Sequence, residues 1–245
     1  MYDFSNRRSI RKYLAKPVED SLLNELLLKA EQTQTMGNLQ LYSVVVTRNA
    51  DKKKALAPAH FNQPMVEGAP VVLTFCADYN RSTQWFLNRK ATTGYDNFLS
   101  FLNAATDTLL YCQTFCNLAE EKSLGLCFLG TTIYNSKQII DTLQLPKLVM
   151  PIATITLGWP AEQGAVSDRL PLQAIVHQEE YKQYSPADIN KYYTAKEELP
   201  ENKHFVEINH TETLAQVYTN FRYRPEDCET MSATLIKTLQ EQGFM

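Results

Sequence analysis

The cationic side chains near the start of the chain are the first residues that could do chemistry. Residues 6–13 read Asn-Arg-Arg-Ser-Ile-Arg-Lys-Tyr, which combines guanidinium groups, an ammonium group and a serine hydroxyl. Guanidinium groups present paired N–H donors that match phosphate oxygens, and a hydroxyl adds a neutral donor. The pattern is suited to a terminal phosphate monoester. The alternative is a solvated basic segment that binds nothing.

The composition of the chain limits the functions that this cationic cluster can have. The chain has 245 residues, of which 44% are hydrophobic and 21% are charged, which is typical of one large globular domain. A net charge of −3 argues against the broad basic surface of a nucleic-acid-binding protein. No apolar run is long enough to span a bilayer, and the start of the chain lacks the pattern of a signal peptide. We therefore expect a cytoplasmic protein without nucleic-acid or membrane partners.

Cysteine and histidine usage argues against both disulfides and a metal site. The five cysteines lie in apolar segments without a CxxC pair, which predicts reduced, buried thiols. The four histidines are dispersed along the chain, so neither residue type forms a pattern with the spacing of a metal site.

Helical and strand patterns alternate along the chain. Apolar periodicity predicts helices near residues 20–32, 49–56, 98–122 and 136–143, a helical excursion within 80–93, and strands near 39–47, 71–77, 124–129 and 151–160. The last third is rich in tyrosine and mostly helical, with breaks at Pro200 and Pro225. These patterns predict one domain over residues 1–245, with a helical C-terminal extension from about residue 175.

The pattern over residues 98–122 is the longest in the chain. Its apolar residues trace one face, and polar residues are few, so we expect a central helix that is nearly enclosed. Asp107 lies within it and needs a polar partner or solvent, because burying an unpaired carboxylate is costly. A structural role for Asp107 is favoured over a catalytic one.

Several catalytic templates are absent from the sequence. There is no GxGxxG, GxxxxGK[ST], GxSxG or HExxH pattern, so dinucleotide-fold, P-loop, hydrolase-elbow and zincin interpretations have no direct support. These absences leave a phosphate-bearing cofactor held by arginines.

Short motifs along nearly the whole chain resemble the FMN-dependent nitroreductase superfamily, and most closely its branch of NADPH-dependent nitro and flavin reductases. Each motif is weak alone, whereas their order and spacing together are specific. They are Arg8-Ser9-Ile10-Arg11, Asn38-Leu39-Gln40, Phe75-Cys76-Ala77-Asp78, Leu124-Gly125-Leu126, Leu129-Gly130, Leu145-Pro146, Leu157-Gly158-Trp159-Pro160 and Arg169-Leu170-Pro171.

The resemblance implies a fold, an assembly and a phosphate site. The fold is α+β, a mixed central sheet flanked by helices, in a homodimer with two FMN sites at the subunit interface. Where relatives carry a lysine two residues before the distant arginine, this chain has Ser167, and where they often carry a histidine it has Arg7. The residues implied for the FMN phosphate and ribityl chain are Arg7, Arg8, Ser9, Arg11 and Arg169.

The resemblance also implies contacts to the flavin ring and to substrates. The ring contacts are Thr35, Met36, Gly37, Gln63, Phe128, Leu129, Gly130 and Thr131. Asn38 is implied beside the substrate, and the candidates for the NADPH phosphate are Lys196, Arg222 and Arg224. Gln63 could instead be an ordinary polar turn residue, and Gly130 could serve a tight bend.

The implied activity is hydride transfer from NADPH or NADH through flavin N5 to a small acceptor: a nitroaromatic, a quinone or free flavin. Because the cofactor carries the chemistry, no protein acid or base is assigned as catalytic. Two alternatives stay open. One is a specialised flavin enzyme of the same fold, such as a reductive dehalogenase, and the other is a non-catalytic flavin-binding protein.

Overall fold

The computed structural model describes residues 3–94 and 96–245, and these form two compact units. The first unit runs to Ala165 and includes Met231–Met245, and the second unit is Val166–Thr230. None of the described helices is long and apolar enough to cross a membrane. Whether residues 1–245 act as one domain stays a prediction.

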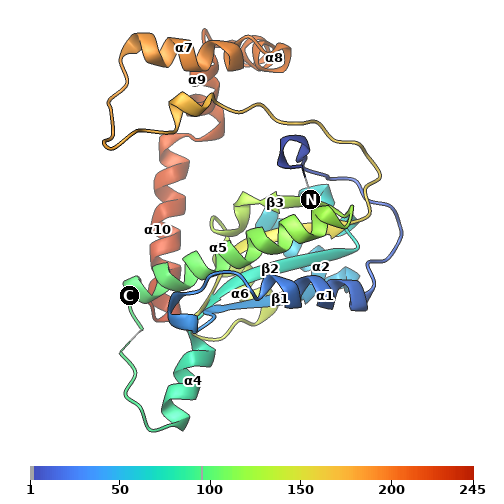
Figure 1. The fold of residues 1–245 in the computed structure, drawn as a ribbon, viewed down its shortest axis with the longest axis vertical. Coiled ribbons are helices and arrows are strands. Elements are labelled where there is room, and N and C mark those ends of the chain that lie inside the picture. The colour runs from blue at the N-terminus through green and yellow to red at the C-terminus, as the bar shows by residue number, and fades with distance from the viewer. Residues whose placement is uncertain (1–2, 95) are drawn as a thin grey trace. The chain divides into compact units, whose positions relative to one another are not determined.

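The first unit contains four strands and six of the described α-helices, together with the end of α10 (Figure 1). The strands are β1 (Tyr42–Thr47), β2 (Val71–Asp78), β3 (Gly125–Leu129) and β4 (Val149–Gly158). The helices are α1 (Asp20–Ala30), α2 (Ala50–Leu56), α3 (Pro64–Gly68), α4 (Asn80–Asn88), α5 (Phe98–Glu121), α6 (Ser136–Leu143) and α10 (Pro225–Gln242).

The strands form one sheet in the order β1-β2-β4-β3. Each of its three pairings is antiparallel. The α+β class with a central sheet between helices is confirmed. The expectation of a mixed sheet is not met within the chain, because every described strand runs opposite to its neighbours and a parallel pair would need a further strand.

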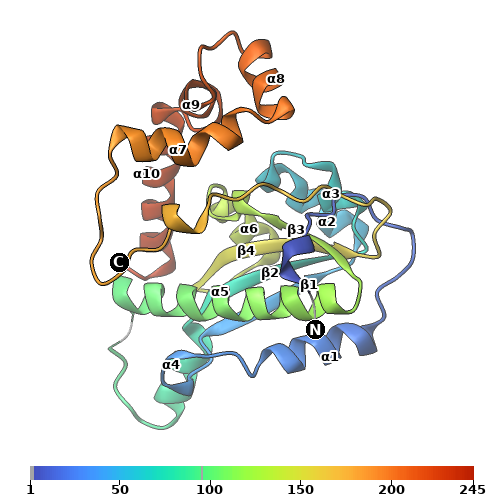
Figure 2. The same cartoon turned by 45° about the horizontal axis from the view of Figure 1, so that its top comes forward.

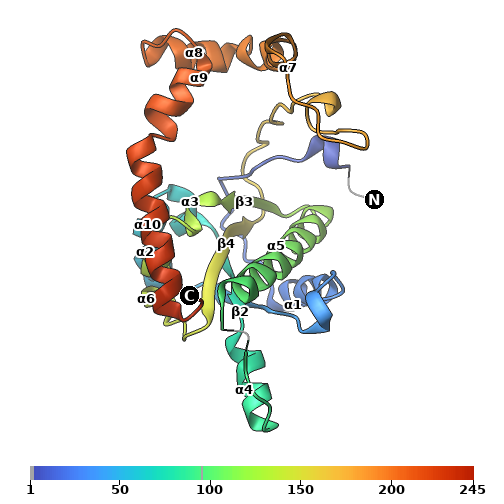
Figure 3. The same cartoon turned by 90° about the vertical axis from the view of Figure 1, so that its left-hand side faces the viewer.

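Helices cover both faces of the sheet (Figure 3). All eight residues of β2 are buried, which explains its unbroken apolar sequence. On one face Leu73 and Phe75 pack in a core with residues of α1 and α5. Side chains along a strand point alternately to the two faces of a sheet. Cys127 and Leu129 of β3 lie in a second core, with residues of α2, α3 and α6.

Helix α5 lies along the sheet beside α1 (Figure 2). The Asn97 side chain caps its first turn by accepting a hydrogen bond from the backbone N–H of Ser100. The prediction that α5 is nearly enclosed is wrong for the single chain. The sheet covers only one side of the helix, and apolar side chains on the other side are 40–67% exposed, namely Phe98, Leu99, Leu102, Leu109 and Leu110.

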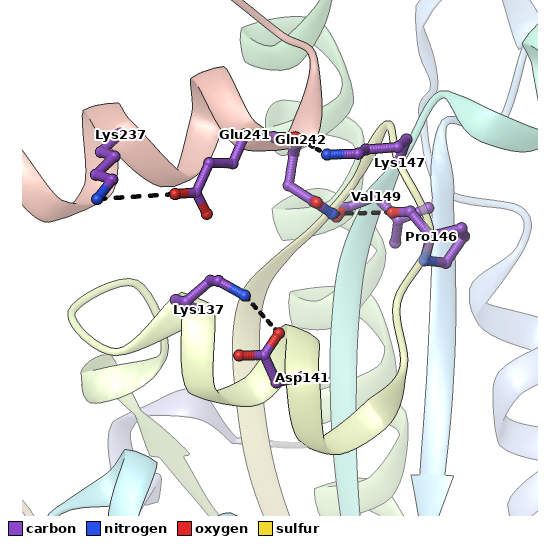
Figure 4. A network of polar contacts seen from close by, with 8 residues as sticks. All are labelled: Lys137, Asp141, Pro146, Lys147, Val149, Lys237, Glu241 and Gln242. Atoms are coloured by element: carbon purple, nitrogen blue, oxygen red, sulfur yellow. Dashed lines mark hydrogen bonds and ion pairs between the residues drawn. The ribbon is translucent and has the colours of Figure 1, made fainter.

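The end of the chain is part of the first unit (Figure 4). The buried Gln242 amide donates to the carbonyl oxygens of Pro146 (2.9 Å) and Val149 (2.6 Å). The carbonyl of Gln242 accepts from the backbone N–H of Leu148 at 2.9 Å. Phe244 is fully buried, with its ring centroid 5.4 Å from that of Phe101. The last residues therefore complete the core at the start of β4.

Smaller differences from the sequence predictions have local causes. The first strand begins at Tyr42 rather than near residue 39, because Gln40 adopts a left-handed backbone conformation (φ 53°). The short helix α3 was not predicted; Pro64 opens it directly after Gln63, in keeping with the preference of proline for a first helical position. The excursion after β2 is helical, as predicted. The prediction of buried, reduced thiols holds for four of the five cysteines, which are buried and free, whereas Cys228 is exposed.

The second unit is mostly helical, as predicted. It comprises α7 (Pro186–Glu197), α8 (Pro200–Ile208), α9 (Leu214–Val217), a π-helical turn (Tyr218–Arg222) and the first residues of α10. Pro200 and Pro225 each open a helix, which confirms them as breaks in the pattern.

Candidate functional site

The basic segment is fixed against β3 by Ile10. The backbone N–H of Ile10 donates to the carbonyl of Leu126 at 2.9 Å. A Cβ atom at Gly125 would lie 2.8 Å from the Ile10 side chain, so only glycine permits this close approach. The buried isoleucine thus anchors the segment while the residues on either side of it stay partly or fully exposed.

A second attachment lies at the end of β4. The N–H of Leu14 donates to the carbonyl of Trp159 at 2.8 Å, and the N–H of Ala161 donates to that of Lys12 at 2.9 Å. Between them, the Tyr13 hydroxyl lies 2.6 Å from the hydroxyl of Thr156. Burial raises the pKa of Tyr13, so the hydroxyl stays protonated. Both attachments restrict the backbone that carries the arginines.

The arginine side chains take two directions. Arg8 donates from Nη1 to the carbonyl of Gln163 at 3.2 Å. Arg11 and Arg7 instead lie near Cys127 of β3. Burial raises the pKa of the Cys127 thiol, and the two guanidinium groups oppose this rise. Two of the three arginines are therefore close to the strand that leads into Phe128–Thr131.

Among the described residues, no ion pair offsets the guanidinium charges of this segment. Within residues 3–94 and 96–245 no carboxylate forms an ion pair with Arg7, Arg8 or Arg11. The carboxylate of Glu162 is nearby, but its Oε1 accepts the backbone N–H groups of Arg11 (2.6 Å) and Lys12 (3.1 Å). The hydrogen bond from Arg11 is the main reason that the pKa of Glu162 is lowered. Guanidinium groups that have no ion-pair partner among the described residues fit a phosphate dianion.

The loop after α1 is held by the buried carboxylate of Asp107 on α5. Asp107 accepts hydrogen bonds from the Thr35 hydroxyl (2.5 Å) and from the backbone N–H groups of Met36 (2.9 Å) and Leu41 (3.3 Å). It is 0% exposed. The expectation that Asp107 has a structural polar partner is confirmed.

The backbone of this loop is unusual. Gly37 and Asn38 both have a φ of 55°, which glycine and asparagine tolerate better than most residues. Arg81 donates to the carbonyl oxygens of Gln40 and Tyr42 and holds the far side of the loop. A cavity of about 340 Å³ lies here, lined by Gly37, Asn38, Leu39, Arg81, Ser82 and Trp85. The loop can therefore present backbone groups in a fixed arrangement.

The segment after β3 has an exposed side and room beside it. Phe128 is 48% exposed although it lies in a strand, and Leu129 is buried. Gly130 begins the 3₁₀ turn Gly130–Thr132, and a Cβ atom built there would meet nothing within 4 Å. The space beside Gly130 is therefore open, and this does not bear on the alternative that the residue serves a tight bend.

Gln63 is linked to this segment through a residue that the sequence analysis did not single out. His60, three residues before Gln63, is fully buried, and its Nδ1 lies 2.8 Å from Oγ1 of Thr131. Burial lowers the pKa of His60 to about 4, which keeps the ring neutral at neutral pH. The only sign in the sequence that His60 is buried is its position next to apolar residues. This position does not identify Thr131 as its hydrogen-bond partner.

Four of the predicted residues lie in the second unit. Arg169 and Lys196 line one cavity of about 560 Å³, together with Tyr193 and Tyr218. Nζ of Lys196 lies 2.9 Å from Oδ2 of Asp168, and this hydrogen bond raises the pKa of Lys196. Arg169 donates from Nη1 to the carbonyl of Asp168 at 2.7 Å. Both cations are thus held by one residue of the loop.

The other two cations of the second unit have different surroundings. The Arg222 guanidinium lies over the rings of Phe205 (4.7 Å) and Tyr218 (5.0 Å). Nε of Arg224 lies 2.7 Å from Asp227 and 3.8 Å from Glu226. The charge of Arg224 is therefore offset locally, whereas that of Arg222 is only stacked on aromatic rings.

Comparison with known proteins agrees with this fold. The sequence pattern of the Nitroreductase family matches residues 4–159. FMN reductase (NAD(P)H) of Bacillus subtilis strain 168 is 31% identical over 182 residues, 72% of each chain. Oxygen-insensitive NADPH nitroreductase of Salmonella typhimurium is 32% identical over 181 residues, 74% of this chain and 72% of the relative. The chain belongs to the Nitroreductase family.

A solved structure is similar over almost the full length. The crystal structure of a protein assigned as an oxidoreductase from Bacteroides fragilis NCTC 9343 is 58% identical and superimposes with a TM-score of 0.97. The match covers 98% of each chain. The likeness thus extends beyond residue 159 and through the second unit.

Replacing Asp107 by Asn tests how the loop is held. An amide offers one acceptor oxygen in place of two, so at least one of the three donors loses its partner. Charge-assisted hydrogen bonds contribute about 1.5–3 kcal/mol, and we expect Asp107→Asn to lower the free energy of unfolding by that order. Amide exchange at Met36 and Leu41 should speed up, as followed by hydrogen–deuterium exchange.

The matched control for this substitution is Asp141→Asn, which removes an exposed ion pair with Lys137 on α6. Exposed pairs of this kind contribute about 0.3–0.5 kcal/mol, so the control should barely change stability. Unchanged exchange at Met36 and Leu41 in Asp107→Asn would show that other contacts hold the loop.

Proposed function

We propose that this protein is an FMN-dependent NAD(P)H oxidoreductase whose acceptors are nitroaromatics, quinones or free flavin. The observation that carries the proposal is the basic segment anchored to β3 through the backbone of Ile10, whose three arginines form no ion pair with a carboxylate among the described residues, in a chain of the Nitroreductase family. When bound, FMN would supply hydride transfer at N5. The nicotinamide donor would leave before the acceptor enters the same pocket, which is a ping-pong order.

The phosphate end of the site is proposed at the basic segment. Arg7, Arg8, Ser9 and Arg11 would bind the phosphate and ribityl chain. The phosphate contact of Arg169, which belongs to the second unit, stays a separate prediction. Support comes from the donor set, since three guanidinium groups and a hydroxyl match a phosphate dianion. Ser167 lies where relatives carry a lysine, so the arginines would provide the positive charge.

The ring end of the site is proposed at two backbone segments and one side chain. Phe128–Thr131 would lie along the ring, Thr35–Gly37 would contribute backbone donors, and the amide of Gln63 would hydrogen-bond the ring edge. The exposed side of Phe128, the open space at Gly130 and the fixed loop under Asp107 support this assignment. Asn38, in the cavity beside the loop, would contact the acceptor.

The nicotinamide nucleotide is proposed to use cations of the second unit. Lys196 lines the cavity there, and Arg222 presents a guanidinium group whose charge is not neutralised by a carboxylate among the described residues. Arg224 would contribute least, because Asp227 and Glu226 already offset its charge. No protein side chain is needed as an acid or base in this proposal.

We also propose a homodimer with the FMN sites at its interface, located in the cytoplasm. The exposed apolar side of α5 supports a second copy as its partner, since the five large side chains named above form one stripe on the longest helix. Stripes of this kind on soluble proteins mark association surfaces. Free thiols at four buried cysteines support a reducing compartment.

The function is tested by the visible absorption spectrum of the purified protein and by anaerobic addition of NADPH and then NADH. We expect a yellow protein that a nicotinamide donor bleaches and that a quinone or nitro compound recolours. A yellow protein that neither donor bleaches would point to a flavin carrier or a specialised enzyme. A colourless protein unable to take up FMN would contradict the proposal.

The phosphate site is tested by Arg11→Ala. Loss of a charge-assisted hydrogen bond should weaken FMN binding about tenfold or more, measured by flavin fluorescence titration. Arg48→Ala is the control, because Arg48 pairs with Asp20 on the surface and should leave FMN affinity unchanged. An unchanged dissociation constant in Arg11→Ala would remove this arginine from the site.

The dimer is tested by Leu109→Glu on α5. A carboxylate in a buried interface is costly unless paired, so we expect the variant to be monomeric in analytical ultracentrifugation and to bind FMN more weakly. Leu28→Glu, at an exposed leucine of α1, should remain dimeric. A wild-type monomer, or a dimeric Leu109→Glu variant, would place the interface elsewhere or exclude it.

A further inference from the structure

His60 joins two segments that are far apart in the sequence. It is 0% exposed and lies next to Ala57 and Ala59 of an apolar core that also contains Cys127 and Leu129. Its Nδ1 is hydrogen-bonded to the Thr131 hydroxyl, whereas its Nε2 is buried and has no partner among the described residues. A buried ring nitrogen without a partner is costly, which indicates that this residue is kept for more than packing.

The chain turns sharply between His60 and Gln63. Phe61 and Asn62 both have a φ of 53°, and the N–H of Gln63 donates to the carbonyl of His60 at 3.1 Å. A phenylalanine rarely adopts this left-handed conformation. Its side chain is 54% exposed, so burial of the ring does not impose the conformation. Strain of this kind persists where the surrounding structure holds it, and it is often found at functional sites.

The segment after β3, to which His60 is hydrogen-bonded, is itself held by further hydrogen bonds. Thr131 lies in the turn Gly130–Thr132, and its carbonyl accepts from the N–H of Tyr134 at 3.1 Å. Asn135 adds a second tie, because its side-chain amide donates to the carbonyl of Ala59 at 3.0 Å. His60–Thr131 and Asn135–Ala59 therefore connect the strained turn to the segment after β3 at two points.

We propose that His60 is a positioning residue of the flavin site, which holds the Gln63 side chain in a fixed place relative to the backbone of Gly130 and Thr131. The proposal rests on the proposed function, since Gln63 and these backbone groups are its ring contacts. A neutral imidazole suits the role: it keeps one nitrogen for Thr131 and brings no charge into the apolar core. His60 contacts neither substrate nor cofactor in this proposal and acts through its neighbours.

The test compares His60→Leu, His60→Asn and Thr131→Val in the full chain. Leucine removes the hydrogen bond, whereas the asparagine amide restores a polar atom near the position of Nδ1. We expect His60→Leu and Thr131→Val each to raise the dissociation constant of FMN about tenfold, and the double variant to be little weaker than either. His60→Asn should stay within about threefold of wild type. His204→Leu, at an exposed histidine of α8, is the control.

A second readout separates positioning from simple stability. The visible spectrum and midpoint potential of bound flavin should shift in His60→Leu, measured well below its unfolding temperature, and return in His60→Asn. In the FMN-free protein, amide exchange at Gln63 and Tyr134 should speed up in His60→Leu. A variant that only unfolds at lower temperature, with FMN affinity, spectrum and potential unchanged, would overturn the proposal.

The outcomes also distinguish this inference from the proposed function. A wild-type protein that a nicotinamide donor bleaches, with His60 variants that bind FMN normally, would overturn the inference alone. A wild-type protein that binds no FMN would overturn both.

Discussion

The buried carboxylate of Asp107 is the interaction on which the arrangement of the first unit depends. It lies in the middle of α5, the helix that covers one face of the sheet, and accepts hydrogen bonds from Thr35, Met36 and Leu41. A fully buried carboxylate is tolerated only when such donors surround it. The donors come from the loop that leads into β1, so the position of α5 sets both the loop conformation and the start of the edge strand.

Much of the fold could be predicted from periodicity, and the failures share one cause. The bounds of α6 agree with the prediction, and β2 is as buried as its unbroken apolar run indicated. Periodicity could show that the apolar residues of α5 trace one face and that polar residues are few elsewhere on it. It could not show that the sheet of the same chain leaves Leu99 and Leu109 exposed, because the hydrophobic pattern is the same whether one chain or two cover it. The relative direction of neighbouring strands likewise depends on the route that the chain takes between them. Local sequence patterns carry no information on that route.

The residues of the candidate site likewise fall into those that the sequence could identify and those that it could not. Arg7 and Arg11 could be recognised as a group because they are close in the sequence. The cost of burying a carboxylate was enough to predict a polar partner for Asp107, but its identity, about seventy residues away, depends on tertiary packing. His60 and Thr131 are 71 residues apart, and no motif pairs them. Contacts of this kind connect segments by their place in the fold, and a single sequence holds no record of them.

The return of the chain to the first unit at Met231 has a consequence for how the protein is made. Gln242 satisfies two carbonyl groups beside β4, and Phe244 fills the core next to Phe101. These residues are synthesised after the sheet, α5 and the basic segment. The core beside β4 therefore cannot close when the sheet and α5 have just been made, and the nascent chain must keep that apolar surface from aggregating until residues 231–245 have emerged from the ribosome.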